Sequence, residues 1–200
     1  MKLIITISAL LLGSFVTADD VQSKPFNLVI QSAADKVLNR QRFSACHSGA
    51  AIESFCVSGR FGADFYFNTT EGSQTPIPGY EPPGVIVWNL PLGGEPNHVS
   101  EPMTFWNDPS TNVALPLLQP GNDRQYVTFD KDNQLAIFSY LDDSHTPPTG
   151  NELKPLKNWF VCQTYYSGYR YLTLAWVMGN GSAKPQNPSC VKVEVERRFV

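Results

Sequence analysis

Proline is dense in the middle of this 200-residue chain. Ten prolines fall within the 45 residues from Pro76 to Pro120, counting both ends. Each proline lacks a backbone N–H and clashes with the preceding helical turn, so no regular helix can run through this stretch. The sequence therefore predicts short extended segments joined by turns here. One helix candidate of one or two turns remains elsewhere, at residues 32–38.

Short runs with strand character recur along the rest of the chain. Residues 191–196 alternate between valine and charged side chains, the period of a strand with one buried face. Ser167-Gly168 and the polar residues 130–133 each separate two apolar runs, so both are expected to be hairpin turns. The expected strands are 26–30, 65–67, 85–88, 103–106, 113–115, 126–129, 135–138, 159–166, 169–176 and 191–196. This pattern predicts a single all-β antiparallel domain.

The first and last expected strands lie close to the two ends of the domain. Pairing them would remove both open edges of a sheet, as a closed barrel requires. A generous count of about twelve short strands is compatible with a β-trefoil. We therefore expect an antiparallel barrel, with a β-trefoil-like form favoured over a jelly roll or other sandwich.

The N-terminus has the features of a secretory signal peptide. Lys2 precedes a short apolar run, residues 3–12, and small residues ending at Ala18 form a cleavage site. A membrane span needs about 20 apolar residues, and this run is shorter. We expect cleavage between Ala18 and Asp19, so that residues 1–18 are removed and residues 19–200 form one secreted, extracellular domain.

Four cysteines fit an oxidising compartment, where disulfides are the default state. Three pairings are possible. The local pairing, Cys46 with Cys56 and Cys162 with Cys190, is favoured because each pair flanks an expected hairpin or turn. Zinc ligation would need C-x₂₋₄-C spacing, and these gaps are much wider.

Two N-x-S/T sequons are a further sign of export. They begin at Asn68 and Asn180, each in a stretch with turn-like composition. We expect both asparagines to be candidate N-glycosylation sites at the surface.

The distribution of charge argues against two classes of partner. The formal net charge is −3, and the basic residues are scattered along the sequence. Nucleic-acid binding needs a concentrated positive face that displaces counterions, and an anionic membrane surface needs the same. We expect neither nucleic acid nor membrane as a partner, and we expect a monomer.

Signatures of catalysis are missing. No G-x-S-x-G pentad marks a nucleophilic serine, and His47, His98 and His145 have no metal-ligand spacing. Paired carboxylates can hydrolyse glycosidic bonds, but sequence gives no distance between acids. The acidic candidates are Glu53, Asp64, Glu101, Asp142 and Asp143. We assign no catalytic residue, no metal and no cofactor, and we expect His47 to be a partly buried histidine beside a disulfide.

Aromatic side chains are the remaining candidates for a binding surface, and many of them lie in one expected hairpin. Alternation sends one face of a strand to the core, and the other face can leave rings exposed for sugars or a protein partner. A packed aromatic core with polar tips at the surface is the more ordinary alternative. The residues are Trp159, Phe160, Tyr165, Tyr166, Tyr169, Tyr171 and Trp176.

Five segments of the chain carry a family resemblance: residues 25–29, 45–53 (Ala-Cys-His-Ser-Gly-Ala-Ala-Ile-Glu), 129–133, 172–177 and 187–190. With these segments the chain resembles a group of small secreted fungal proteins, a domain-of-unknown-function family whose members are often labelled "IgE-binding protein". It implies secretion, a single domain and no catalytic residues to transfer. The family pattern implies Asn-Gly before the second strand, where this chain has Asn39-Arg40.

These observations favour a non-enzymatic binding or interaction module that faces cell-wall or host glycans and proteins, and that host antibodies can recognise as an allergen. Two alternatives stay open. One is a small extracellular hydrolase that uses carboxylates, or His47 with an acid. The other is a proteinase inhibitor that presents the loop from Thr69 to Gly84.

Overall fold

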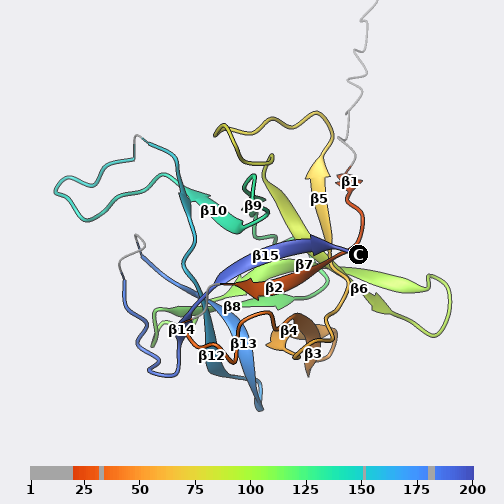
Figure 1. The fold of residues 1–200 in the computed structure, drawn as a ribbon. Coiled ribbons are helices and arrows are strands. Elements are labelled where there is room, and N and C mark those ends of the chain that lie inside the picture. The colour runs from red at the N-terminus through yellow and green to blue at the C-terminus, as the bar shows by residue number, and fades with distance from the viewer. Residues whose placement is uncertain (1–19, 32–33, 151, 180–182) are drawn as a thin grey trace, which may run out of the picture.

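Strands account for all the regular structure in the part of the chain that the structure describes. The structure, a computed structural model, describes residues 20–31, 34–150, 152–179 and 183–200. Within these ranges there are fifteen strands and no helix (Figure 1). The all-β prediction is confirmed, and the described part of the helix candidate, 34–38, consists of bends and turns. The strands are β1 (Asp20–Gln22), β2 (Phe26–Gln31), β3 (Phe43–Gly49), β4 (Ile52–Val57), β5 (Tyr66–Thr70), β6 (Gly84–Pro91), β7 (His98–Trp106), β8 (Val113–Leu118), β9 (Thr128–Phe129), β10 (Leu135–Ser139), β11 (Lys154–Leu156), β12 (Trp159–Tyr166), β13 (Tyr169–Val177), β14 (Val191–Lys192) and β15 (Glu194–Phe199).

Most of the strands belong to one antiparallel sheet. Its order is β1-β5-β6-β7-β8-β4-β13-β12-β14, and β3 joins it through β4. Strands β9, β10 and β11 form a small second sheet, and β2 pairs with β15 in a two-stranded ribbon. In Figure 1 this ribbon lies across β7 and β8, and side chains of all four strands meet in one apolar cluster. The ribbon therefore packs on one face of the large sheet.

The sheet is not closed into a barrel, so the trefoil-like barrel prediction is wrong. The first and last long strands do pair, with Ile30 opposite Val195. The run 191–196, expected as one strand, is nevertheless divided at Val193 between two sheets: β14 pairs with β12, whereas β15 pairs with β2. The N–H of Val193 donates to the carbonyl of Trp159 at this junction (3.1 Å). The terminal strands consequently form a separate ribbon instead of joining the two edges of the large sheet.

The large sheet carries apolar side chains on both faces where β8 and β13 meet. Ala114 and Trp176 are opposite each other and belong to the main core beneath the ribbon. Their neighbours Val113 and Val177 point to the other face, because successive strand residues alternate. They belong to a second, smaller cluster there. The segment that follows β13 packs on this cluster through Ala183 and Cys190.

The β12–β13 hairpin confirms the turn predicted at Ser167-Gly168. Both residues have positive φ, 49° and 92°, the conformation that a type I′ hairpin turn requires. Trp159 and Trp176 lie opposite each other and are buried, whereas Tyr165 is 63% exposed. Both aromatic hypotheses hold in part, because the hairpin supplies the core at its base and exposes aromatic surface near its tip.

Arg197 fastens the ribbon to the rest of the domain. Its side chain is buried and donates to both carboxylate oxygens of Glu81 and to Oδ1 of Asn133. The guanidinium also lies 4.2 Å from the ring centroid of Phe129 and 4.7 Å from that of Phe199. A bidentate ion pair combined with cation–π contacts stabilises a buried arginine. One residue thus connects β15, the β5–β6 loop and the β9–β10 turn.

Candidate functional site

Two of the five candidate acids come together in the fold. Glu53 on β4 and Met103 on β7 both lie opposite Leu118 of the intervening strand β8. Glu101 precedes Met103 by two residues, so its side chain points to the same face of the sheet. The exposed fractions of Glu53 and Glu101 are 4% and 0%. We call these two residues the carboxyl pair.

The carboxyl pair is short of hydrogen-bond donors among the described residues. Within the described residues, no N–H or hydroxyl donor reaches either oxygen of Glu101 or Oε2 of Glu53. Burial, and then the neighbouring Glu53 carboxyl through hydrogen bonding and charge repulsion, raises the pKa of Glu101 to about 9. The raised pKa keeps a proton on Glu101 at neutral pH, and this O–H can donate to the neighbouring carboxyl of Glu53. The pair therefore carries at most one negative charge at neutral pH.

The other three acidic candidates lie elsewhere. Asp64 accepts from the amide of Asn27 (3.2 Å). Hydrogen bonds from the hydroxyl and backbone N–H of Ser144 lower the pKa of Asp142, which also lies 3.8 Å from His145. Asp143 is exposed and borders a groove that is described below.

The histidines do not assemble with these acids into a catalytic group. His47 is exposed, so the expectation of a partly buried ring is wrong. Its ring packs edge-on against Tyr169 at 5.4 Å, and its carbonyl accepts from the hydroxyl of Tyr171 (3.0 Å). Glu53 is its register partner on β4, but the carboxyl of Glu53 is buried, and no ion pair joins the two side chains in the described part of the chain.

A groove of about 640 Å³ is the best candidate for a ligand site. It runs between the end of β7, the strands β10 and β11, and the residues that follow β13. We call it the aromatic groove. Its lining residues are Thr104, Phe105, Asn107, Asp123, Arg124, Gln125, Ile137, Phe138, Ser139, Leu141, Asp143, Leu156, Trp176, Met178 and Gly179.

The floor of the aromatic groove is held rigidly by the core. Trp176 packs against Trp159 with ring centroids 4.7 Å apart, and Phe105 contacts both tryptophans at 6.1–6.3 Å. The indole N–H of Trp159 donates to the carbonyl of Leu135 (2.9 Å), which ties this cluster to β10. Leu141 at the rim is 61% exposed. The groove thus combines a fixed aromatic floor with an open apolar edge.

The rim of the aromatic groove is polar and carries both signs of charge. Asp123, Arg124 and Asn107 are exposed, and Asp143 contributes a second carboxylate. Arg124 is paired with Asp20 of β1 at 3.1 Å. These groups can donate and accept hydrogen bonds around a bound molecule. The arrangement suits an uncharged polar ligand with a flat apolar face.

One protein-family model matches the chain. It is described as a domain of unknown function (DUF7907), and it matches residues 23–199. The chain belongs to this family. The match contains both the carboxyl pair and the aromatic groove. No curated protein and no solved structure matches the chain.

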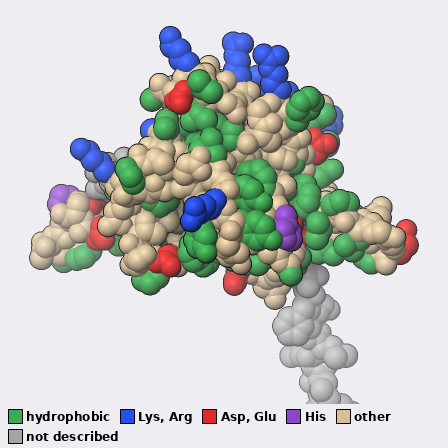
Figure 2. Space-filling view, turned by 90° about the horizontal axis from the view of Figure 1, so that it is seen from below, with side chains coloured by type: hydrophobic (Ala, Val, Ile, Leu, Met, Phe, Trp, Pro, Cys, Tyr) green, Lys and Arg blue, Asp and Glu red, His purple; other side chains and the backbone are tan. Residues whose placement is uncertain are grey.

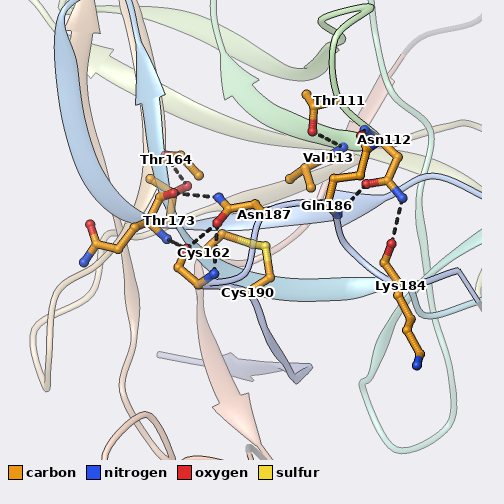
Figure 3. The surroundings of a disulfide bond; sticks show 12 residues. Thr111, Asn112, Val113, Cys162, Thr164, Thr173, Lys184, Gln186, Asn187 and Cys190 are labelled. Atoms are coloured by element: carbon orange, nitrogen blue, oxygen red, sulfur yellow. Dashed lines mark hydrogen bonds between the residues drawn. A yellow bond between two sulfur atoms is a disulfide. The ribbon is translucent and has the colours of Figure 1, made fainter.

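Two disulfides brace the DUF7907 domain. Cys46 and Cys56 join β3 to β4, and Cys162 joins β12 to Cys190, which is the local pairing that the sequence favours. Figure 3 shows how Asn187 and Cys190 hold the segment after β13 against β12. The amide of Asn187 donates to the carbonyl of Gln163 (2.8 Å). The disulfide therefore fixes a segment that begins at the edge of the aromatic groove.

The same segment is also bound to the start of β8. The amide of Asn112 donates to the carbonyl of Lys184 (2.9 Å), and its Oδ1 accepts from the backbone N–H of Gln186 (2.9 Å) (Figure 3). The N–H of Met178 donates to the carbonyl of Asn112 (2.9 Å). These contacts position Met178 and Gly179 at the wall of the groove.

The two sequons have different positions. Asn68 lies inside β5, between Gln22 of β1 and Val85 of β6, and its Oδ1 accepts from the amide of Gln22 (3.1 Å). The expectation of a turn at Asn68 is wrong, because β1 adds an outer strand to β5. Asn180, and the cleavage site at Ala18 and Asp19, lie outside the described residues.

The loop between β5 and β6, considered for proteinase inhibition, is fastened at its far end. The N–H of Glu81 donates to the carbonyl of Phe129 (2.9 Å), and Gly79 accepts from the N–H of Lys131 (3.0 Å). The ring of Tyr80 packs against Phe138 at 5.5 Å.

In the part of the chain that the structure describes, no helix is long and apolar enough to cross a membrane.

Proposed function

We propose that this DUF7907 protein is a secreted, non-enzymatic binding protein whose aromatic groove takes an uncharged glycan of a cell wall or host surface. The observation that carries the proposal is the groove itself. It combines a rigid floor of Phe105 and Trp176 with a rim of amide, carboxylate and guanidinium groups. Sugars present apolar C–H faces and hydroxyl edges, so they match aromatic rings and polar rims together.

The size and rigidity of the groove support this assignment. Its volume of about 640 Å³ lies within the usual range for small-molecule sites, about 300–1,000 Å³. The floor rings are fixed by their packing against Trp159. A preformed site loses little conformational entropy when a ligand binds. Binding therefore needs no rearrangement of the sheet.

The state of the carboxyl pair supports a role without catalysis. Glu53 and Glu101 are both buried, and the pKa of Glu101 is raised by burial and by Glu53. A glycosidase needs its two carboxyls on opposite sides of a bound sugar. A pair sealed inside the sheet serves that reaction poorly.

Secretion is part of the proposal, and the two disulfides are compatible with it. N-terminal sequencing of protein exported by a eukaryotic host tests the processing directly. Asp19 is expected as the first residue, and digestion with an endoglycosidase is expected to reduce the mass if Asn68 or Asn180 carries a glycan. A retained N-terminal methionine on exported protein would contradict the signal peptide.

A glycan array followed by calorimetry tests the binding function. Glycans that bind the wild type are titrated against Asn107→Ala and Asp123→Ala, which remove rim groups that make no side-chain hydrogen bond within the described residues. Each change is expected to weaken binding about 10-fold. The matched controls Asn122→Ala and Asp132→Ala, at exposed positions outside the groove lining, are expected to bind like the wild type. No glycan bound, or equal losses in the controls, would overturn the proposal.

Hydrolysis is the second candidate, and one observation favours it: two exposed carboxylates, Asp123 and Asp143, border the same groove. Incubation with cell-wall polysaccharides and measurement of new reducing ends decides between the two functions. Hydrolysis predicts turnover that Asp123→Asn or Asp143→Asn reduces at least 100-fold while glycan binding persists. Binding alone predicts no new reducing ends with any variant.

A further inference from the structure

Four of the seven arginines of the chain converge on one pocket. Arg40, Arg42, Arg60 and Arg198 line a cavity of about 660 Å³, together with Val29, Val37, Asn39, Gln41 and Gly59. Basic residues that are scattered along the sequence therefore come together at this place. Figure 2 shows several Lys and Arg side chains standing out along the upper edge of the molecule and others elsewhere on this face. We call this cavity the arginine pocket.

Three backbone contacts bring the arginine pocket together. Arg198 on β15 lies opposite Asn27 on β2, and Val29 of β2 bridges to Arg42. The N–H of Arg42 donates to the carbonyl of Gly59 (2.7 Å), which places Arg60 beside it. Segments remote in sequence thus lie in the order β15, β2, residues 40–42 and residues 59–60. This order explains why the sequence alone shows no basic cluster.

The turn after β2 positions Arg40, the fourth arginine of the pocket. Arg40 has a φ of 67°, the left-handed conformation that favours glycine, and its N–H donates to the carbonyl of Ile30 (2.8 Å). This is the position at which the family resemblance implies Asn-Gly. The chain therefore carries a guanidinium at a backbone position where a glycine would be less strained.

Local acids neutralise little of this charge. Glu196 pairs with Arg198 at 2.9 Å. Arg42 donates to the neutral amide oxygen of Asn27 (2.8 Å). Among the described residues, no carboxylate lies within 4.0 Å of the guanidinium groups of Arg40, Arg42 or Arg60. Like charges brought together around one cavity repel each other unless a counter-charge enters.

The arginines and the other residues that line the pocket indicate which class of anionic ligand fits it. A guanidinium presents a planar fork of donors that matches phosphate, sulfate and carboxylate oxygens in pairs. Val29 and Val37 add apolar contact, and the lining contains no aromatic side chain on which a base could stack. The cavity is large enough for a sugar ring rather than a single ion. These features favour a compact sugar carrying several oxyanion groups over a nucleic-acid strand.

We propose that the arginine pocket is a second binding site, separate from the aromatic groove, for a sugar bearing several sulfate or phosphate esters. The two sources of that chemistry are a sulfated glycan and a soluble sugar phosphate. The proposal does not depend on the function proposed for the groove, because the two sites share no lining residue.

Calorimetric titration of the full chain in about 150 mM salt tests the proposal, with a sulfated tetrasaccharide and inositol hexakisphosphate as separate probes. At least one probe is expected to bind with a 1:1 stoichiometry. The affinity is expected to fall about 10-fold in Arg60→Ala and in Arg40→Gly, and further in the double variant. Arg40→Gly places glycine at a positive φ, so its loss of binding cannot be attributed to a strained turn.

Controls separate the pocket from general charge attraction. Arg170→Ala removes an exposed arginine outside the pocket and is expected to bind both probes like the wild type. The proposal is overturned if neither probe binds at millimolar concentration, or if Arg170→Ala weakens binding as much as Arg60→Ala. Binding to vesicles containing 30% phosphatidylserine, or to single-stranded DNA, with no binding of either of the two probes would also overturn it.

Discussion

The carboxyl pair and the arginine pocket are both clusters of like charge, and the fold treats them in opposite ways. Glu53 and Glu101 are buried in the large sheet, and within the described residues three of their four carboxyl oxygens have no hydrogen-bond partner. The arginines lie around an open cavity beside the β2–β15 ribbon, and Arg40, Arg60 and Arg198 are exposed. The acids lower their mutual repulsion by holding a proton. The arginines cannot lose a proton at physiological pH, so they stay charged and attract an anion.

Because of this difference, we expect the carboxyl pair to affect the stability of the fold and the arginine pocket to affect ligand binding. A buried carboxyl that keeps its proton behaves as a polar core group, and its contribution to stability depends on pH. An exposed guanidinium contributes little to stability, because water and salt screen it. Its effect appears when a ligand binds. We therefore expect substitutions in the carboxyl pair to change folding, and substitutions in the arginine pocket to change binding.

The largest expected effect is that of Glu101→Ala. The change leaves a cavity in the sheet and removes the O–H that can donate to Glu53, so the free energy of unfolding at pH 5 is expected to fall by about 2–4 kcal/mol. Urea denaturation measures the difference. The exposed control Glu71→Ala is expected to stay within about 0.5 kcal/mol of the wild type. Equal small effects at both positions would remove the distinction between buried and exposed acids.

The next effect is the pH dependence of stability. The pKa of Glu101 is about 9 in the folded protein against an ordinary value of 4.5. Its protonated form is the one that the fold stabilises, so this contribution is complete below pH 4.5 and is lost as the pH rises through 9. The isosteric variant Glu101→Gln cannot ionise and is expected to be more stable than the wild type at pH 9 by about 1–3 kcal/mol. Melting temperatures measured from pH 5 to pH 9 compare the two; parallel curves would refute the raised pKa.

The arginine pocket predicts a smaller, ligand-dependent gain. At a ligand concentration of ten times the Kd, linkage stabilises the wild type by about 1.4 kcal/mol. Inositol hexakisphosphate or the sulfated tetrasaccharide is therefore expected to raise the melting temperature of the wild type by a few degrees. At the same concentration the Arg60→Ala variant is expected to show a much smaller rise. An equal rise in both proteins would place the anion elsewhere.

The smallest effect concerns the turn that carries Arg40. Its φ of 67° costs an L-residue about 1 kcal/mol relative to glycine. Arg40→Gly is therefore expected to raise the free energy of unfolding by about 0.5–1 kcal/mol while it weakens anion binding. Thermal unfolding without ligand measures the first effect. A loss of stability would mean that the Arg40 side chain supports the fold through contacts of its own.

The sequence predicts the local features of this fold better than its long-range ones. The dipeptide Ser167-Gly168 predicts its hairpin turn, because a type I′ turn needs two residues that accept positive φ. The division of the last strand at Val193 is not visible in a run that alternates regularly from 191 to 196. Because of this division, β14 pairs with β12 and β15 pairs with β2, so the terminal strands do not close a barrel. The division depends on the partner strands β12 and β2, which are remote in sequence.

The candidate sites were accessible to sequence reasoning only in part. Glu53 and Glu101 stand among the acidic candidates, but the sequence gives no sign that β8 would bring them to one buried spot. The aromatic groove joins positions from Thr104 to Gly179, and the arginine pocket joins positions from Val29 to Arg198. No spacing rule links such positions, because sheet order rather than local pattern sets their distance.

The carbon-13 NMR titration of the glutamate carboxyl groups tests the contrast between the two clusters most directly. The Cδ resonance of Glu101, assigned with Glu101→Gln, is followed from pH 3 to pH 10. The account predicts that this carboxyl is still protonated at pH 7 and titrates near pH 9. A midpoint near pH 4.5, shared with the exposed glutamates, would show that the carboxyl pair is charged and solvated, and it would contradict the account.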